Sequence, residues 1–321
     1  MTAKTQAERI GALRALRLPH SLRLTLPAAA LFGAAMGLFA IIQFAAPGLA
    51  GTDGYYHIQM AHLMRQQGLK PQFVWLPMTI LNPASYYDHH FLYHVYLALF
   101  VPPNATPEAL VYGAKVASVV LPALACLAIG WMLRGQGVPG AWLWALGLFA
   151  VSDALLYRMS MPRAQSASLL VLALGLHWLL NRRGWLLLPL GFLYVWLYDG
   201  FPLLLVLAAA CVAATWATER RLEWKPLAAA GAGIALGLLI NPYFPQNLTF
   251  IASHLLPKFG EMSTRVGNEW YPYETWTLVE NSAGALAACV LAVLALGWNR
   301  ERIDRPTLTA LLLVVFFGLL V

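Results

Sequence analysis

The chain has 321 residues, of which 60% are hydrophobic and only 11% are charged. A soluble globular domain is roughly 45–50% apolar and about 25% charged, so this composition excludes a water-soluble globular protein, and it is too apolar for a disordered one. The net charge of +7 would suit a nucleic-acid partner, but the positions of the charges along the chain argue against one.

Apolar runs dominate the chain and predict membrane-spanning helices, because a helix needs about 20 mostly apolar residues to cross a bilayer. We predict nine spans, over residues 26–47, 109–133, 140–157, 165–181, 184–198, 201–217, 226–242, 283–298 and 307–321. The expected fold is all-α, a polytopic membrane helical bundle forming one domain over residues 1–321. The last run reaches Val321, so we expect the natural protein to continue beyond it.

Two connections between the predicted spans are long, residues 51–108 and 243–282, whereas the others on the same side have only a few residues. Long loops on a rigid scaffold usually carry function. Inside the first loop, apolar spacing predicts a helix near residues 54–67 that lies in the membrane interface. A second short helix is expected near residues 89–101, ended by a Pro-Pro pair.

The charges indicate how the chain is oriented. Most of the 21 Lys and Arg residues fall in the N-terminal segment and in the short loops on the same side, and cytoplasmic loops are usually enriched in these residues. We therefore place the N-terminus in the cytoplasm and both long loops outside. The net positive charge follows from this topology, and we expect membrane lipids, not nucleic acid, as its partner.

The first candidate site residue is Asp53, just after the first span, in the sequence Gly51-Thr-Asp-Gly-Tyr-Tyr-His. An Asp here suits a helix N-cap. It equally suits a carboxylate at the membrane surface that binds a metal or orients a nucleophile. The two roles are compatible.

The densest group of candidate ligands is Asp88-His89-His90, followed by His94. In a helix, His90 and His94 share one face because they are four residues apart. Asp88 and His90 together are suited to a divalent metal. The alternative is a capping Asp with histidines that face water and lipid phosphate.

Two arginines, Arg158 and Arg163, flank a short loop predicted on the same outer side. Guanidinium groups bind phosphate in a bidentate manner, so this pair is a candidate clamp for a phosphate or diphosphate. The alternative is that both side chains reach for lipid headgroups. Lys115, near the outer end of the second predicted span, is open to the same two interpretations.

The second loop ends in Thr277-Leu-Val-Glu280, just before the eighth predicted span. An acid at a helix start is favoured by the helix dipole. Glu280 is also a candidate second carboxylate, brought to Asp53 from the other long loop.

The order of these features resembles the catalytic subunit of oligosaccharyltransferase, a member of the GT-C superfamily of membrane glycosyltransferases. The matching residues are Thr52-Asp53-Gly54-Tyr55-Tyr56-His57 in the first loop and Thr277-Leu278-Val279-Glu280 in the second. The resemblance implies a GT-C-type fold and catalytic roles for Asp53 and Glu280. It also implies a divalent metal, Mg²⁺ or Mn²⁺, at these two acids, and Asp88 and His90 are further candidate ligands.

Through the resemblance we expect transfer of a sugar or oligosaccharide from a polyprenyl (pyro)phosphate carrier to an acceptor protein or glycan. The expected place is a bacterial inner (plasma) membrane, with the active site facing outward. The family's second acidic motif is replaced here by Ser166-Ala167-Ser168, and its acceptor-binding soluble domain does not precede Val321. Two alternatives stay open: a GT-C enzyme that adds a single sugar to a lipid or glycan, and a non-enzymatic protein that binds a lipid carrier.

Overall fold

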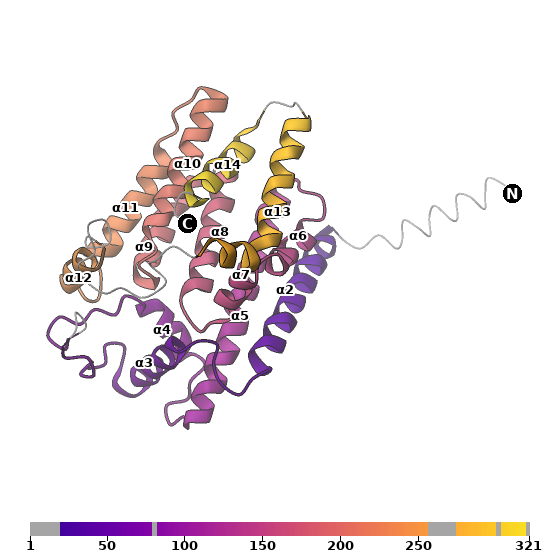
Figure 1. Ribbon diagram of the computed structural model, residues 1–321. Helices are drawn as coiled ribbons and strands as arrows, with labels where there is room; N and C mark the ends of the chain where they lie inside the picture. Colours follow the sequence, from indigo (N-terminus) through magenta and orange to yellow (C-terminus); the bar gives the residue numbers. More distant parts are fainter. Residues whose placement is uncertain (1–19, 79–81, 256–273, 300–302, 319–321) are drawn as a thin grey trace.

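The computed structural model describes residues 20–78, 82–255, 274–299 and 303–318 (Figure 1). Within this part of the chain every regular element is a helix, and no strand occurs. The predicted all-α fold is therefore confirmed.

Four helices are long and apolar enough to cross a membrane, and a bent pair counts as a fifth. The four are α2 (His20–Phe44), α5 (Pro107–Gly135), α10 (Pro202–Glu219) and α13 (Thr275–Asn299). The bent pair is α7 (Asp153–Ser160) and α8 (Gln165–Leu180), with 108° between them. These helices are consistent with the predicted integral membrane protein.

The remaining predicted spans coincide with shorter helices, so the described chain does not contain nine spans of full length. These helices are α6 (Ala141–Gly147) continued by η1 (Leu148–Ala150), η2 (Gly184–Leu186) continued by α9 (Leu187–Leu197), α11 (Lys225–Leu239) and α14 (Arg305–Gly318). The predicted single run 140–157 is divided, because η1 ends at Ala150 and α7 begins anew at Asp153. The hydroxyl of Ser152 accepts a hydrogen bond from the Leu155 amide at 3.3 Å and so caps the new helix.

Small residues set the close approach of α9 and α11. Gly233 and Gly237 lie one turn apart on α11, and a Cβ at Gly233 would overlap the backbone of Leu188 on α9. Glycines at this spacing allow helix backbones to approach closely in membranes, where van der Waals packing supplies most of the attraction. The Trp196 indole donates to the Gly237 carbonyl at 2.9 Å and ties the pair further.

Basic residues gather where the α8–α9 and α10–α11 turns meet the start of α14. Arg182 contacts Glu219 at 2.5 Å and Glu223 at 3.2 Å, and Arg305 donates to the carbonyls of Leu179 and Leu180. These contacts join three connections that the sequence predicts on one side of the membrane. We refer to this end of the molecule as the Arg182 end.

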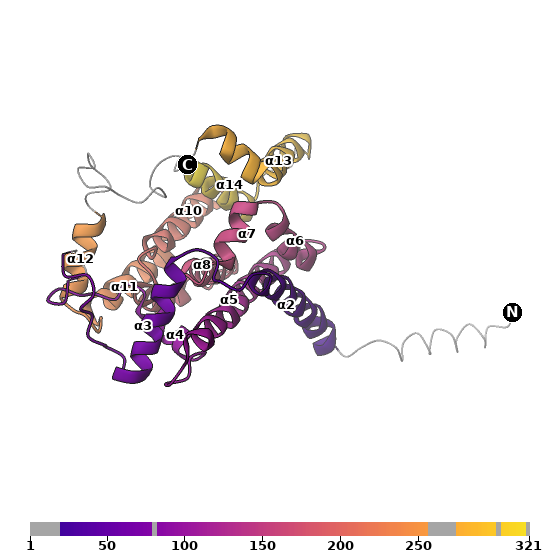
Figure 2. The same ribbon diagram turned by 60° about the horizontal axis from the view of Figure 1, so that its bottom comes forward.

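The opposite end carries α3 (Asp53–Gln67) and α4 (Phe91–Ala98), in the lower part of Figure 1, with α12 (Gln246–Leu255) above them at the left. We refer to it as the Asp53 end. Turning this end forward shows α7 between α3 and α13 (Figure 2). The two predicted short helices thus exist, and more than half of the residues of α3 are buried against its neighbours. Its place in a membrane interface stays a prediction.

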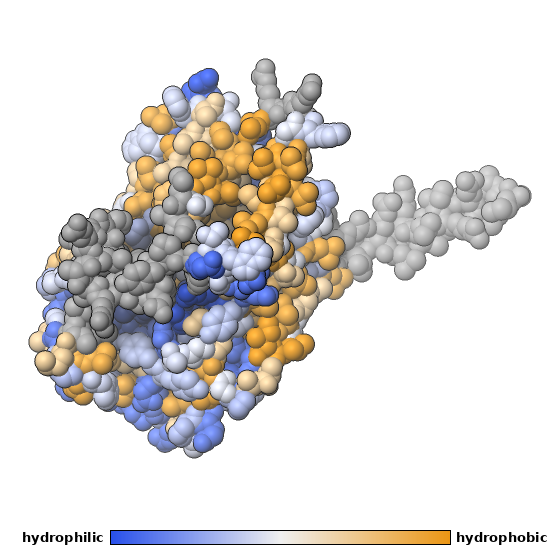
Figure 3. All heavy atoms as spheres, in the orientation of Figure 1, coloured by the Kyte–Doolittle hydropathy of each residue, from blue (hydrophilic) through white to orange (hydrophobic). Residues whose placement is uncertain are grey.

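Hydrophobic surface covers much of α13, and none of its most apolar stretch is buried within the chain. Figure 3 shows hydrophilic side chains gathered around a hollow beside the start of this helix. Apolar surface and a polar hollow therefore adjoin each other at the Asp53 end.

The glycine contact between α9 and α11 gives a test of the packing. We expect Gly233→Leu to destabilise the protein by about 1–3 kcal/mol, because added side-chain volume has no space there. Thermal unfolding of the purified protein in detergent measures the effect. Gly231→Leu on the same helix is the control, since no atom lies within 4 Å of a Cβ at that position. Equal melting temperatures for the two variants would contradict this packing.

Candidate functional site

Asp53 begins α3 and lies in a loop that packs tightly on the α7–α8 connection. Gly51 has a φ of +74°, a conformation that glycine adopts without steric cost, and a Cβ there would lie 2.5 Å from the Met161 methyl carbon. A Cβ at Gly54 would overlap Pro162. The glycines on both sides of Asp53 therefore let its loop reach the residues next to Arg163.

An ion pair follows from this close approach. A carboxylate oxygen of Asp53 lies 3.0 Å from a terminal guanidinium nitrogen of Arg163. The Arg163 side chain is 18% exposed, whereas that of Asp53 is 48% exposed. The guanidinium is thus held between the protein interior and the surface, with its charge beside an acid from the other loop.

The start of α13 joins the same region through a break in its helix. Ser282 has a non-helical conformation. In an unbroken helix the Asn281 carbonyl would accept a hydrogen bond from the Ala285 amide, and here both groups need other partners. The Ser152 hydroxyl donates to the Asn281 carbonyl at 3.1 Å, and the Ala285 amide donates to the Val151 carbonyl at 3.0 Å. These two bonds attach α13 to the beginning of α7.

A cleft of about 400 Å³ lies where these elements meet. Its lining includes both predicted arginines and one residue of α13: Asp153, Ala154, Tyr157, Arg158, Met161, Arg163 and Asn281. The two guanidinium groups bring positive charge to it, and Asp153 brings one carboxylate. Asp53 contributes through Arg163, while Glu280 is exposed directly beside Asn281. The convergence of the Asp53 and Glu280 carboxylates stays a prediction.

Behind Arg163 lies a buried chain of three side chains that joins α3 to α4. Asp88 accepts a hydrogen bond from Nδ1 of His94 at 2.7 Å, and Nε2 of His94 lies 2.8 Å from Nδ1 of His57. The other Asp88 oxygen accepts from the His90 amide at 3.0 Å. With His94 neutral and donating to Asp88, its Nε2 accepts from His57, so Nε2 of His57 is left as an acceptor.

Burial favours the neutral form of two histidines here, His57 and His90. The pKa of His57 and of His90 is lowered well below the usual range, first by burial and then by neighbouring histidines and the positive charge of Arg163. The rings of His57 and His90 contact each other with centroids 4.8 Å apart, and Nδ1 of His90 is enclosed without a hydrogen-bond partner. Arg163 therefore lies close enough to act electrostatically on both histidines.

The predicted metal ligands do not fit a metal ion as they are placed. Asp53 is engaged by Arg163, and Asp88 by His94 and a backbone amide. Across the described ranges, no three or more His, Cys, Asp or Glu residues are arranged to hold an ion. Within this cleft, the positive charge that could meet a phosphate is that of Arg158 and Arg163.

Sequence reasoning missed two contributors to the site, Asn281 and Tyr157. The sequence does signal the close approach of the loops, since glycines flank Asp53 and Pro162 precedes Arg163, but it does not show that these residues touch. His90 and His94 lie near each other as their spacing predicts, with ring centroids 6.0 Å apart. The hydrogen bonds of the His94 ring, however, are to Asp88 and His57.

No family model, no curated protein and no solved structure matches this chain. Functional conclusions depend on the residues around the cleft and on the sequence resemblance described above.

The buried histidines predict a pH dependence for α3 and α4. Because their pKa is depressed in the folded state, the unfolded state binds more protons below about pH 6.5, so the histidines cost no stability above that pH and destabilise the fold as pH falls. Hydrogen exchange over residues 53–67 and 91–98 at pH 5 and pH 7.5 measures it, after correction for intrinsic exchange rates. We expect faster opening at pH 5, and less acceleration in His57→Gln. Unchanged protection would contradict burial of neutral histidines.

Proposed function

We propose that the protein is a membrane glycosyltransferase that moves a sugar or oligosaccharide from a polyprenyl (pyro)phosphate to an acceptor. One observation carries this proposal: Arg163, paired with Asp53, lines a cleft together with Arg158 and with Asn281, the neighbour of Glu280. Loops far apart in sequence thereby meet at an anion site beside apolar surface. The GT-C resemblance supplies the reaction class.

The carrier would bind with its two chemically different parts in different places. The phosphate accepts hydrogen bonds from the guanidinium groups of Arg158 and Arg163. The polyprenyl chain lies along the hydrophobic surface next to the hollow seen in Figure 3. A site for a soluble nucleotide sugar would not need this neighbouring apolar surface.

In the proposed reaction an acceptor oxygen forms a bond to the anomeric carbon of the sugar while the bond from that carbon to the phosphate oxygen breaks. The electron pair of the broken bond stays on the phosphate, where negative charge develops. Arg158 and Arg163 stabilise that charge, and preorganised contacts of this kind contribute about 100- to 1000-fold each to rate. The acceptor proton passes to Glu280, which is exposed and precedes Asn281 of the cleft lining by one residue.

Asp53 acts mainly on Arg163 in this scheme. A carboxylate 3.0 Å from the guanidinium fixes its orientation at the edge of the cleft that Arg163 lines. This arrangement supports a phosphate site whose charge comes from arginine, and a divalent metal at Asp53, Glu280, Asp88 and His90 stays a prediction from sequence.

The Lys and Arg distribution supports a cytoplasmic Arg182 end and an outward-facing Asp53 end. We propose a bacterial inner membrane as the location, and a protein, glycan or lipid as the acceptor. A non-enzymatic carrier-binding protein would use the same arginine cleft but would not need Glu280. The variants below separate these two functions.

We expect Arg163→Gln to lower the rate of sugar transfer by about 100-fold or more, through loss of phosphate stabilisation. Arg221→Gln removes the same charge at the Arg182 end and serves as the control. Transfer from a radiolabelled polyprenyl-linked sugar in proteoliposomes measures the rate, and carrier affinity is measured separately. Equal transfer rates in the two variants would retire the phosphate role of Arg163.

Glu280→Gln is expected to abolish transfer while carrier affinity stays within about twofold, because the amide cannot accept the proton. If the wild-type protein binds carrier without turnover under conditions that saturate acceptor and donor, the carrier-binding alternative replaces the enzyme. If Glu280→Gln transfers at the wild-type rate, another group is the base.

The role of a metal is tested by chelation. We expect transfer to persist after dialysis against EDTA, because Asp53 is already occupied by a guanidinium. Loss of activity in EDTA that Mg²⁺ or Mn²⁺ restores would instead support the metal predicted from sequence. Carrier binding with and without EDTA is measured in parallel.

A further inference from the structure

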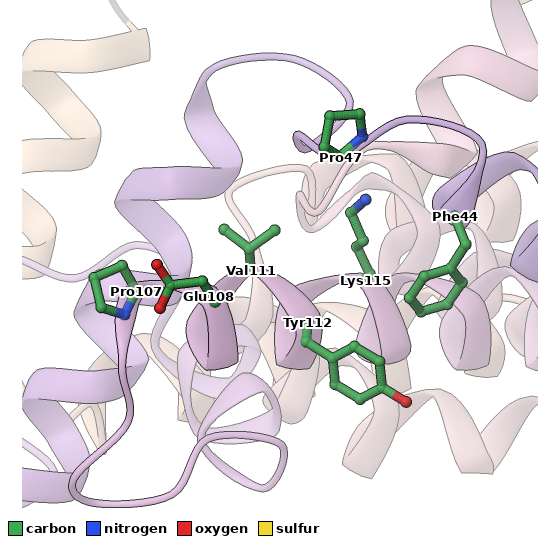
Figure 4. A pocket seen from close by; sticks show the side chains of 7 residues that line it. All are labelled: Phe44, Pro47, Pro107, Glu108, Val111, Tyr112 and Lys115. Carbon is green, nitrogen blue, oxygen red and sulfur yellow. The ribbon is translucent and has the colours of Figure 1, made fainter.

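A second cleft lies at the Asp53 end, between the end of α2 and the start of α5. It has a volume of about 350 Å³. Figure 4 shows the seven side chains that line it: Phe44, Pro47, Pro107, Glu108, Val111, Tyr112 and Lys115. Most of them are apolar, and the sugar-transfer scheme uses none of them.

The chemically unusual member is Lys115. Its side chain is buried, with only 4% of the residue exposed, although it carries an ammonium group. The ammonium donates to the carbonyl of Ala46 and lies 5.6 Å from the centre of the Phe44 ring. Among the described residues no carboxylate lies within ion-pair distance of it. An ammonium has three donors, so two remain for a ligand.

The position of this ammonium favours a lipid. α2 and α5 are both long enough to cross a membrane, and the cleft lies where they end and begin. Phe44 and Tyr112 flank it, with ring centroids 5.6 Å apart and both side chains largely exposed. Exposed aromatic residues at span ends commonly lie at the level of lipid headgroups. A phospholipid can place its phosphate beside the Lys115 ammonium and an acyl chain along these rings, so that it contacts both the charged and the apolar parts of the lining.

Glu108 restricts the headgroup. It lies seven residues before Lys115, with Val111 between them on the same side of α5, so the two charges are separated by roughly 10 Å along the helix. Figure 4 shows the two side chains at opposite ends of this row. A carboxylate at that place attracts an amine and repels a second negative charge.

From this arrangement we infer that the cleft binds a zwitterionic glycerophospholipid of the surrounding bilayer, with its phosphate on Lys115 and its ethanolamine ammonium on Glu108. The site is separate from the arginine cleft and does not depend on the proposed enzyme activity.

The test is native mass spectrometry of the detergent-purified protein with added dioleoyl phosphatidylethanolamine, dioleoyl phosphatidylglycerol, polyprenyl phosphate or inorganic phosphate. We expect phosphatidylethanolamine to bind most tightly, and Lys115→Met to weaken its binding by about tenfold or more. Lys70→Met is the matched control, because Lys70 also donates to a carbonyl, at 2.7 Å, and lies 4.7 Å from an aromatic ring centre, but it does not line the cleft.

A second variant keeps the test decisive if Lys115→Met does not fold. Glu108 is exposed, and Glu108→Gln is expected to shift preference from phosphatidylethanolamine towards phosphatidylglycerol. Unchanged lipid binding in Lys115→Met, or an unchanged preference in Glu108→Gln, would overturn the inference. If polyprenyl phosphate binds more tightly than phosphatidylethanolamine and Lys115→Met abolishes that binding, the cleft belongs to the carrier. If inorganic phosphate binds as tightly as phosphatidylethanolamine, the cleft is a phosphate site and not a lipid site.

Discussion

The contact on which the functional interpretation depends is the ion pair between Asp53 and Arg163. An ion pair that is half exposed contributes little to stability, typically between about 0 and 1 kcal/mol. Its importance is geometric, because it joins the start of α3 to the sharp bend between α7 and α8. The other end of α7 is attached through Val151 and Ser152 to α13, so the cleft that Arg163 lines lies where three separate parts of the chain meet. No single loop of the chain forms this arrangement on its own.

Much of this architecture follows from patterns that are local in sequence. Apolar length predicts the long helices, and spacing predicts α3 and α4, because both signals depend on residues within one or two turns. The same reasoning overestimates the number of full spans, since apolar runs such as 140–157 do not reveal an internal break. At that break Ser152 caps a new helix, and the Val151 carbonyl accepts a hydrogen bond from the Ala285 amide of α13. The second bond depends on packing against a distant helix, which the run itself does not encode.

The candidate site shows the same division between local and non-local information. The sequence marks Asp53, Arg158 and Arg163 by residue type and position, and the structure places the last two around one cleft with Asp53 beside them. The sequence does not predict that Arg163 forms an ion pair with Asp53, the carboxylate expected to bind a metal. Nor does the sequence predict that His94 forms a hydrogen bond with Asp88. Whether an acid pairs with a metal ion or with an arginine depends on the distance between loops. Here the close contact of Gly54 with Pro162 determines that distance.

Two acids of the first loop, Asp53 and Asp88, have different partners. Asp88 is buried and accepts hydrogen bonds from His94 and the His90 amide, whereas Asp53 is half exposed and pairs with Arg163. The histidines around it stay neutral because burial opposes their protonation, and they add no positive charge that would repel the guanidinium. Arg163 therefore pairs with the exposed carboxylate of Asp53, and the rings of His57 and His90 that feel its charge are neutral. The field of its charge is directed into the cleft that Arg158 shares, where an anionic ligand gains the most from it.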